Sequence, residues 1–157
     1  MRAVDTQAAG SKRGLALYNP APMRVATWNV NGIRAAHQQF LDFVIAEKPD
    51  VLCLQEIKAT LAQVPESICE LGDYWCYWHG AGGYSGVALH LRRETFPDKP
   101  AFTHPDFDHE TRIVQAEIAD TIFASVYVPN GGKDYEAKIR FMKSLIAAPS
   151  FRNSGFE

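Results

Sequence analysis

The residues of this chain that could do chemistry are polar side chains that follow short apolar runs. Asn29 and Asn31 end one such run, and Glu56 follows the run at 51–54, with Lys58 two residues further on. Residues two apart on a strand lie on the same side, so both amides would face one way. Amides can donate to a phosphate or offer oxygen to a cation, and a carboxylate on rigid backbone suits Mg²⁺. Lys58 could neutralise a phosphate or pair with the carboxylate.

Two further polar positions occur at turns downstream. Tyr84 lies in the glycine-rich segment 83–86, where an exposed aromatic ring could press against a sugar or base step. Tyr127 closes another apolar run and would place a phenolic donor at the end of a strand, and Asn130 adds an amide in the following turn. Tyr84, Tyr127 and Asn130 are therefore also candidate site residues.

Each of these signals also has a simpler interpretation. Asn31 with Gly32 could form only a turn, and Glu56 could be a solvated loop acid. The segment 83–86 could be a plain glycine-rich turn, and Tyr127 a core tyrosine before a Pro-Asn-Gly turn. No single position decides between these readings.

The elements that must position these side chains follow from apolar periodicity. The pattern predicts strands at 23–30, 51–54, 74–78, 87–91, 112–118 and 121–128, the first of them buried. It predicts helices at about 35–47 and 64–71, and a last helix with Asp134 as N-cap and Tyr135, Ile139, Met142 and Ile146 on one face. The initial strand–helix–strand order indicates an α/β fold with parallel pairing, in which ligands bind at strand ends.

The composition is that of an ordinary globular domain, with 157 residues, 46% apolar and 22% charged. A net charge of −2 gives no overall basic field, so a nucleic-acid partner must be held by a local patch or through a metal. No apolar run reaches the ~18 residues of a membrane span, and the first residues lack the apolar stretch of a signal peptide. We therefore expect a cytoplasmic protein with no membrane partner.

The three cysteines, Cys53, Cys69 and Cys76, form no Cys-x-x-Cys pair and are odd in number. Free thiols in a reducing compartment explain this pattern better than a zinc site or a disulfide framework.

Five phrases, in order, resemble the exonuclease III branch of the endonuclease/exonuclease/phosphatase superfamily, which includes the abasic-site endonucleases. They cover most of residues 24–146 and are RVATWNVNGIRAA (24–36), PDVLCLQEIKAT (49–60), GYSGVALHLRRE (83–94), FDHETRIVQAEI (107–118) and YVPNGGKDYEAKIRFM (127–142). In the fourth phrase Thr111 stands where the family usually has glycine, which puts the local turn in question.

The resemblance assigns roles to the polar positions. It implies that Glu56 binds the metal with Asn31 near the ion, and that Asn29 orders the catalytic acid and the phosphate. Tyr127 corresponds to the tyrosine that contacts the scissile phosphate. The positions that look like contacts to DNA are Arg34, Lys58, Tyr84 and Asn130.

The implied fold class is α/β: the N-terminal part of a two-sheet α/β sandwich with outer helices (DNase I-like), with the second sheet largely missing. We expect a disordered leader at 1–22, an incomplete domain at 23–148 and an irregular tail at 149–157. If one sheet lacks its partner, its inner face is exposed, and we expect self-association through it.

The implied function is metal-dependent hydrolysis of DNA phosphodiesters in base excision repair, by abasic-site endonuclease and 3′-to-5′ exonuclease action. The resemblance implies Mg²⁺, with Mn²⁺ as the alternative ion, and double-stranded DNA with abasic sites or 3′ ends as the partner. The family's later Gly-Asp-x-Asn motif and Asp-His pair do not occur here, since Asp108-His109 lies inside the fourth phrase. We therefore expect a truncated chain that is inactive alone. The alternatives are a catalytically dead or DNA-binding remnant and a phosphatase of the same superfamily.

Overall fold

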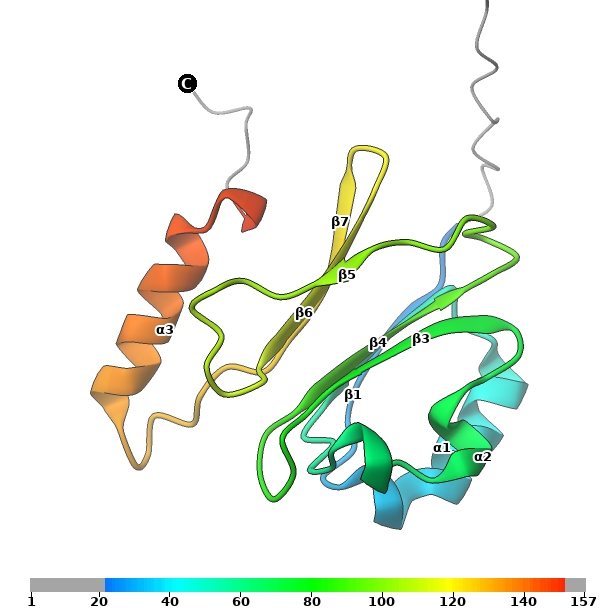
Figure 1. Cartoon of the computed structure of the whole chain (residues 1–157), viewed down its shortest axis with the longest axis horizontal. Coiled ribbons are helices and arrows are strands. Elements are labelled where there is room, and N and C mark those ends of the chain that lie inside the picture. Colours follow the sequence, from blue (N-terminus) through cyan, green and yellow to red (C-terminus); the bar gives the residue numbers. More distant parts are fainter. Residues whose placement is uncertain (1–21, 152–157) are drawn as a thin grey trace, which may run out of the picture.

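The computed structural model describes residues 22–151. Nearly all of the expected leader, residues 1–21, and the end of the expected tail, residues 152–157, lie outside this range. In the described part the chain forms two sheets with helices outside them, as the resemblance implies (Figure 1). The fold class is therefore confirmed, and three strands represent the second sheet.

The first sheet has four strands in the order β1-β2-β4-β3. Their bounds are β1 (Val25–Asn29), β2 (Val51–Gln55), β3 (Tyr74–His79) and β4 (Val87–Arg92). The strands β1 and β2 run parallel because helix α1 (Ile33–Glu47) connects them, whereas β4 is antiparallel to both of its neighbours. The prediction of a parallel α/β unit at the start of the chain is confirmed.

The second sheet is antiparallel, in the order β5-β6-β7. Its strands are β5 (Phe102–Thr103), β6 (Ile113–Ile118) and β7 (Thr121–Val126). The two-residue strand β5 was not predicted, since so short a run has no measurable periodicity. The helix α3 (Tyr135–Ala147) lies beside this sheet, on the side away from α1, and a short 3-10 turn, η2 (Pro149–Phe151), follows it (Figure 1).

Two apolar cores hold the layers together. Side chains of β2 and β4 that point away from the second sheet pack under α1, where Phe40 and Leu52 are fully buried. The opposite faces of β2 and β4 pack against β6, where Leu89 and Val114 are fully buried. Burial of each such side chain contributes about 1.5–3 kcal/mol to the stability of the fold, so the contact between the sheets is a major source of that stability.

Two sequence expectations about burial are wrong. The first strand is not buried throughout, because among the described residues β1 is an edge strand that pairs with β2 alone, and Val25 is 61% exposed. The inner face of the first sheet is not exposed as a whole, because the second sheet covers it at β2 and β4. On β1, the alternate residues Val25, Thr27 and Asn29 are exposed, while Ala26 and Trp28 pack against the core under α1.

The region between β2 and β3 also differs from expectation. In place of a helix over 64–71, the chain forms a 3-10 turn, η1 (Leu61–Gln63), and a single helical turn, α2 (Glu66–Cys69). Pro65 is the residue before α2, and its missing N–H ends the preceding turn. The predicted N-cap of α3 is confirmed, since the Asp134 side chain accepts a hydrogen bond from Ala137 N.

All three cysteines are free, and burial raises the pKa of Cys53 and of Cys76 to about 11. In the described residues no helix is long and apolar enough to cross a membrane.

Candidate active site

The carboxylate of Glu56 lies at the rim of the first sheet, directly after β2. Its backbone has φ +53, an uncommon left-handed conformation for a residue other than glycine. Two backbone bonds fix this turn: Gly32 N donates to Glu56 O at 2.8 Å, and Ile57 N donates to Gly86 O at 3.1 Å. The prediction that rigid backbone presents this carboxylate is therefore confirmed.

Three side chains from three parts of the chain meet Glu56. Asn29 Nδ2 donates to Glu56 Oε1 at 2.8 Å, and Lys58 Nζ lies 3.0 Å from Glu56 Oε2. The Tyr127 hydroxyl lies near enough to the carboxylate to contribute to its lowered pKa. The bond from Asn29, followed by that from Lys58, holds the pKa of Glu56 below its ordinary value of 4.5, so the carboxylate is ionised at neutral pH.

The register of the strands explains why Asn29 reaches Glu56. In the parallel pair, Asn29 lies opposite Gln55, so the residue after β2 follows at the same edge. The Asn29 side chain also accepts a bond from Asn31 N at 3.1 Å. This bond closes the turn after β1, and Gly32 N and Ile33 N, which donate to Glu56 O and Ile57 O, hold that turn against the turn after β2.

The second sheet brings Tyr127 to the same rim. Ser125, two residues earlier, is fully buried and donates its hydroxyl to Leu54 O at 2.9 Å, while Gln55 Nε2 donates to Ser125 Oγ at 3.2 Å. These bonds cross from β7 to β2 and place the next residue on that face, Tyr127, over Glu56. Burial, and then the neighbouring Glu56 carboxylate, raise the pKa of the Tyr127 phenol above its ordinary value of 10, so it stays protonated and can donate.

Arg112 contributes to the site, although the sequence did not indicate it. Its guanidinium carbon lies 4.9 Å from the centre of the Tyr127 ring, and its backbone oxygen accepts from Tyr127 N at 2.8 Å. Arg112 Nε donates to Glu110 Oε2 at 2.6 Å. Arg112 thus fixes both the ring and the backbone of the tyrosine.

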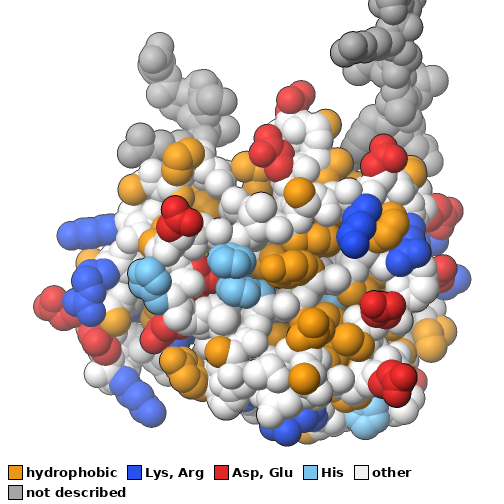
Figure 2. Space-filling view, in the orientation of Figure 1, with side chains coloured by type: hydrophobic (Ala, Val, Ile, Leu, Met, Phe, Trp, Pro, Cys, Tyr) orange, Lys and Arg blue, Asp and Glu red, His pale blue; other side chains and the backbone are white. Residues whose placement is uncertain are grey.

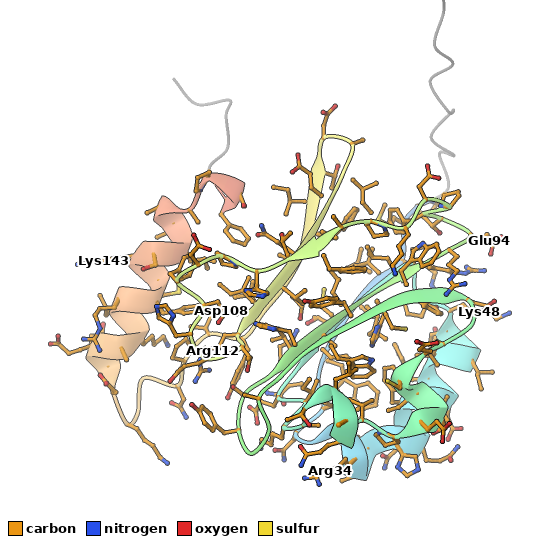
Figure 3. The ribbon with its side chains drawn as sticks, in the orientation of Figure 1. Arg34, Lys48, Glu94, Asp108, Arg112 and Lys143 are labelled. Atoms are coloured by element: carbon orange, nitrogen blue, oxygen red, sulfur yellow. The ribbon has the colours of Figure 1, made fainter. Side chains whose placement is uncertain are left out.

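Asp108 holds the segment that carries Arg112 (Figure 3). Its carboxylate, 1% exposed, accepts from the backbone N–H groups of Arg112 and Ile113 at 2.8–3.0 Å and from His79 Nε2 at 3.0 Å. Burial would raise the pKa of Asp108, but the bonds from His79 and the two amides outweigh it, and the pKa lies below its ordinary value. In the sequence, these two residues could have been found from their spacing, since Asp108 lies four residues before Arg112 and Arg112 directly precedes the buried start of β6.

The predicted DNA-contacting residues lie apart from this centre, with the exception of Lys58. Arg34 is exposed in the first turn of α1, and the Tyr84 side chain is 61% exposed. Asn130 is exposed and accepts from Gly132 N at 3.0 Å, which forms the turn that the simpler interpretation expected. Within residues 22–151, no hydrogen bond or ion pair joins these three side chains to Glu56, and their roles remain predictions.

The charges around the site are mixed. On the face shown in Figure 2, acidic and basic side chains are interspersed, in agreement with a net charge of −2. A hollow of about 600 Å³ lies beside Lys48, Asp73 and Arg93, at the opposite end of the first sheet from Glu56. The candidate site is therefore an open rim and lies away from this hollow.

The oxygen atoms of the rim fit a hard divalent ion. Glu56 and Asn31 supply one carboxylate and one amide oxygen, and Mg²⁺ commonly takes one or two protein carboxylates with water as the remaining ligands. Within residues 22–151 no group of three or more His, Cys, Asp or Glu side chains is placed to hold a metal. An ion here would depend on Glu56, on amide oxygens and on water.

The architecture is that of the DNase I-like abasic-site endonucleases, with two packed sheets and a polar rim at the strand ends. An abasic-site endonuclease from Archaeoglobus fulgidus superposes with a TM-score of 0.68 and 27% identity, over 80% of this chain and 50% of that one.

Residues 26–153 match the endonuclease/exonuclease/phosphatase family, and the chain belongs to this family, in the branch of exonuclease III and the abasic-site endonucleases. A zebrafish DNA repair nuclease, APEX1, is 36% identical over 118 residues, which are 72% of this chain and 38% of that protein. An exodeoxyribonuclease of Bacillus subtilis is 34% identical over 121 residues, 73% of this chain and 46% of that protein. The chain thus spans less than half the length of these relatives.

Proposed function

We propose that this chain carries the metal-binding and phosphate-binding part of a DNA phosphodiester hydrolase of base excision repair. The proposed reaction is cleavage beside an abasic site and removal of nucleotides from 3′ ends, and the proposed partner is double-stranded DNA. The meeting of Glu56, Asn29 and Tyr127 at one rim is the observation that supports this proposal most directly. The relatives named for DNA repair and exonuclease activity support the class of substrate.

The chain's own groups suit a reaction at an anionic phosphate. Tyr127, protonated at neutral pH, can donate to a phosphoryl oxygen, and so can the amide of Asn29. Glu56, with Asn31 beside it, would hold Mg²⁺ or Mn²⁺, which would supply neutralisation of the phosphoryl and leaving oxygens when bound. We assign Arg34, Lys58, Tyr84 and Asn130 to the DNA backbone and grooves.

We expect slow cleavage by the chain alone. General-base assistance contributes about 10²–10⁴-fold, and we assign no base to the described residues. The test is a time course on an abasic duplex with and without Mg²⁺, comparing the chain with Glu56→Gln. We expect at most a trace of cleavage, lost with Glu56→Gln. Turnover at the rate of a full-length relative would contradict the proposed inactivity, and trace cleavage unaffected by Glu56→Gln would contradict the proposed site.

The second candidate is a DNA-binding remnant without catalysis. It is favoured by the small number of carboxylates at the rim, where Glu56 is joined only by amide, lysine and tyrosine side chains. Mobility shift of an abasic duplex without cleavage, independent of Mg²⁺, would favour this candidate. Cleavage of a phosphorylated small molecule but not of DNA would instead favour a phosphatase of the same family.

We further propose a cytoplasmic location and self-association through the uncovered side of β1. Sedimentation of the chain across a concentration series tests the second point, and a monomer at every concentration would contradict it.

A further inference from the structure

The ammonium group of Lys58 lies between the two oxygen ligands proposed for the metal. Its Nζ lies 2.5 Å from Asn31 Oδ1 and 3.0 Å from Glu56 Oε2. A cation that bridges a carboxylate oxygen and an amide oxygen takes the same place as an ion bound by that pair. The rim therefore already holds one positive charge, supplied by the chain.

The backbone imposes this arrangement. Asn31, Glu56 and Lys58 all have left-handed φ values of +46, +53 and +51. Such conformations are unfavourable for residues other than glycine and persist only where surrounding contacts hold them. Here Lys58 N donates to Ser85 O at 3.0 Å and Asn31 N donates to Asn29 Oδ1 at 3.1 Å. Both turns are thus held in the form that brings the three side chains together.

The Lys58 side chain keeps a route to water. It is 33% exposed, compared with 19% for the Glu56 side chain, so the ammonium can leave the bridge while the carboxylate stays in place. A flexible four-carbon stem allows this movement with no change in the backbone.

We propose that Lys58 competes with the divalent ion for the oxygens of Glu56 and Asn31, so that an ion binds only by displacing the ammonium. This inference rests on the proposed function, because it concerns the same metal site. The intact bridge keeps Glu56 ionised and in position. After displacement the ammonium lies beside the site and is available to a DNA phosphate.

The test is the affinity of the 157-residue chain for Mn²⁺ alone, measured by water proton relaxation. Lys58→Met keeps the length of the stem and removes the competing charge. Because an ion no longer has to break a hydrogen-bonded charged pair, we expect Lys58→Met to bind Mn²⁺ at least about tenfold more tightly. Lys58→Arg, which keeps a cation in reach, should bind like the unchanged chain.

Lys48→Met is the matched control. Lys48 follows α1 at φ +43, and Figure 3 shows it at the α1 end remote from Arg34. This variant has the same net charge as Lys58→Met, and we expect its Mn²⁺ affinity to stay within about twofold of the unchanged chain, because screened charges beyond a Debye length of about 10 Å interact weakly. A gain as large as that of Lys58→Met would attribute the effect to net charge and overturn the proposal.

A second measurement follows Lys58 itself. Acylation of surface lysines with a mild reagent, read by peptide mass, should modify Lys58 faster when Mg²⁺ is present, while Lys48 is modified at an unchanged rate. An unchanged rate at Lys58 under saturating Mg²⁺ would overturn the displacement.

The outcomes separate the two proposals. If the unchanged chain binds Mn²⁺ and Lys58→Met binds it equally or more weakly, Lys58 is not a competitor and the metal site stands. If neither binds Mn²⁺, or if Glu56→Gln binds as well as the unchanged chain, the proposed metal site fails and the competition fails with it. Circular dichroism of each variant confirms that the fold is retained.

Discussion

Thr111 has an uncommon backbone conformation in the loop before β6. Its φ is +53, where a β-branched side chain is an outlier, and the resemblance implies glycine as the usual residue at this position. Its hydroxyl donates to Glu110 O at 2.7 Å and lies 3.3 Å from the Ser85 hydroxyl, which offsets part of this strain. The sequence put this turn in question, and the structure places the threonine there in a strained left-handed conformation.

We expect Thr111→Gly to stabilise the chain by about 1 kcal/mol. Relief of strain of about 1–3 kcal/mol exceeds the entropic cost of glycine, about 0.5–1 kcal/mol. Urea denaturation gives the free energy of unfolding. Thr111→Ala is the control, because it keeps Cβ and the strain while removing the hydroxyl. A Thr111→Gly variant less stable than Thr111→Ala would contradict the argument.

At the scale of elements, the loop before β6 positions the second sheet relative to the candidate site. Asp108 gathers three donors, from His79 and from the amides of Arg112 and Ile113, and so sets where β6 begins. Arg112 in turn holds Tyr127, the residue after β7 whose hydroxyl lies near Glu56. A chain of contacts thus leads from this loop to the candidate site, and the loop provides no ligand of its own.

We expect Asp108→Asn to lower the free energy of unfolding by about 2–3 kcal/mol. Asparagine keeps the size of the side chain but turns an N–H group towards donors that then lack an acceptor. The loss should be smaller at pH 3 than at pH 7, because the carboxylate of the unchanged chain is itself protonated as the pH falls through its lowered folded pKa. Urea denaturation at both pH values measures this, and an equal loss at both would argue against a role for the charge.

At the scale of the whole molecule, one buried histidine couples stability to pH. His90 on β4 is fully buried, and neither ring nitrogen has a hydrogen-bond partner among the described residues. It packs edge-on against Trp78 at 4.6 Å and Phe40 at 5.8 Å, and its register neighbour Cys76 is a neutral thiol. Burial lowers the pKa of His90 from 6.5 to about 3.

The sign of the pH effect follows from this depressed pKa. Between pH 6.5 and 3 the unfolded chain binds a proton at His90 and the folded chain does not, so stability falls as the pH falls. The slope approaches about 1.4 kcal/mol per pH unit. We expect His90→Leu to flatten the stability profile between pH 6.5 and 5, measured by urea denaturation. An unchanged slope would show that His90 is accessible to protons in the folded chain.

Much of the fold could be predicted from the sequence because local patterns determine it. Alternating and periodic apolar residues predicted six of the strands and the two longer helices, α1 and α3, and Asp134 was predicted as the N-cap of α3. The burial of β1 could not be predicted, because it depends on whether another strand lies beside and above Val25. The local sequence of β1 carries no information about whether such a strand is present.

The candidate site divides in the same way. The types and spacing of Asn29, Asn31 and Glu56 were sufficient to propose a cation site, because short-range rules place residues at strand ends. The contact between Lys58 and both proposed ligands, and the support of Tyr127 by Arg112, depend on left-handed turns and on the packing of one sheet over the other. Local sequence determined which groups are available at the rim. The tertiary structure decided which of them touch, because those contacts join segments that are distant in the chain.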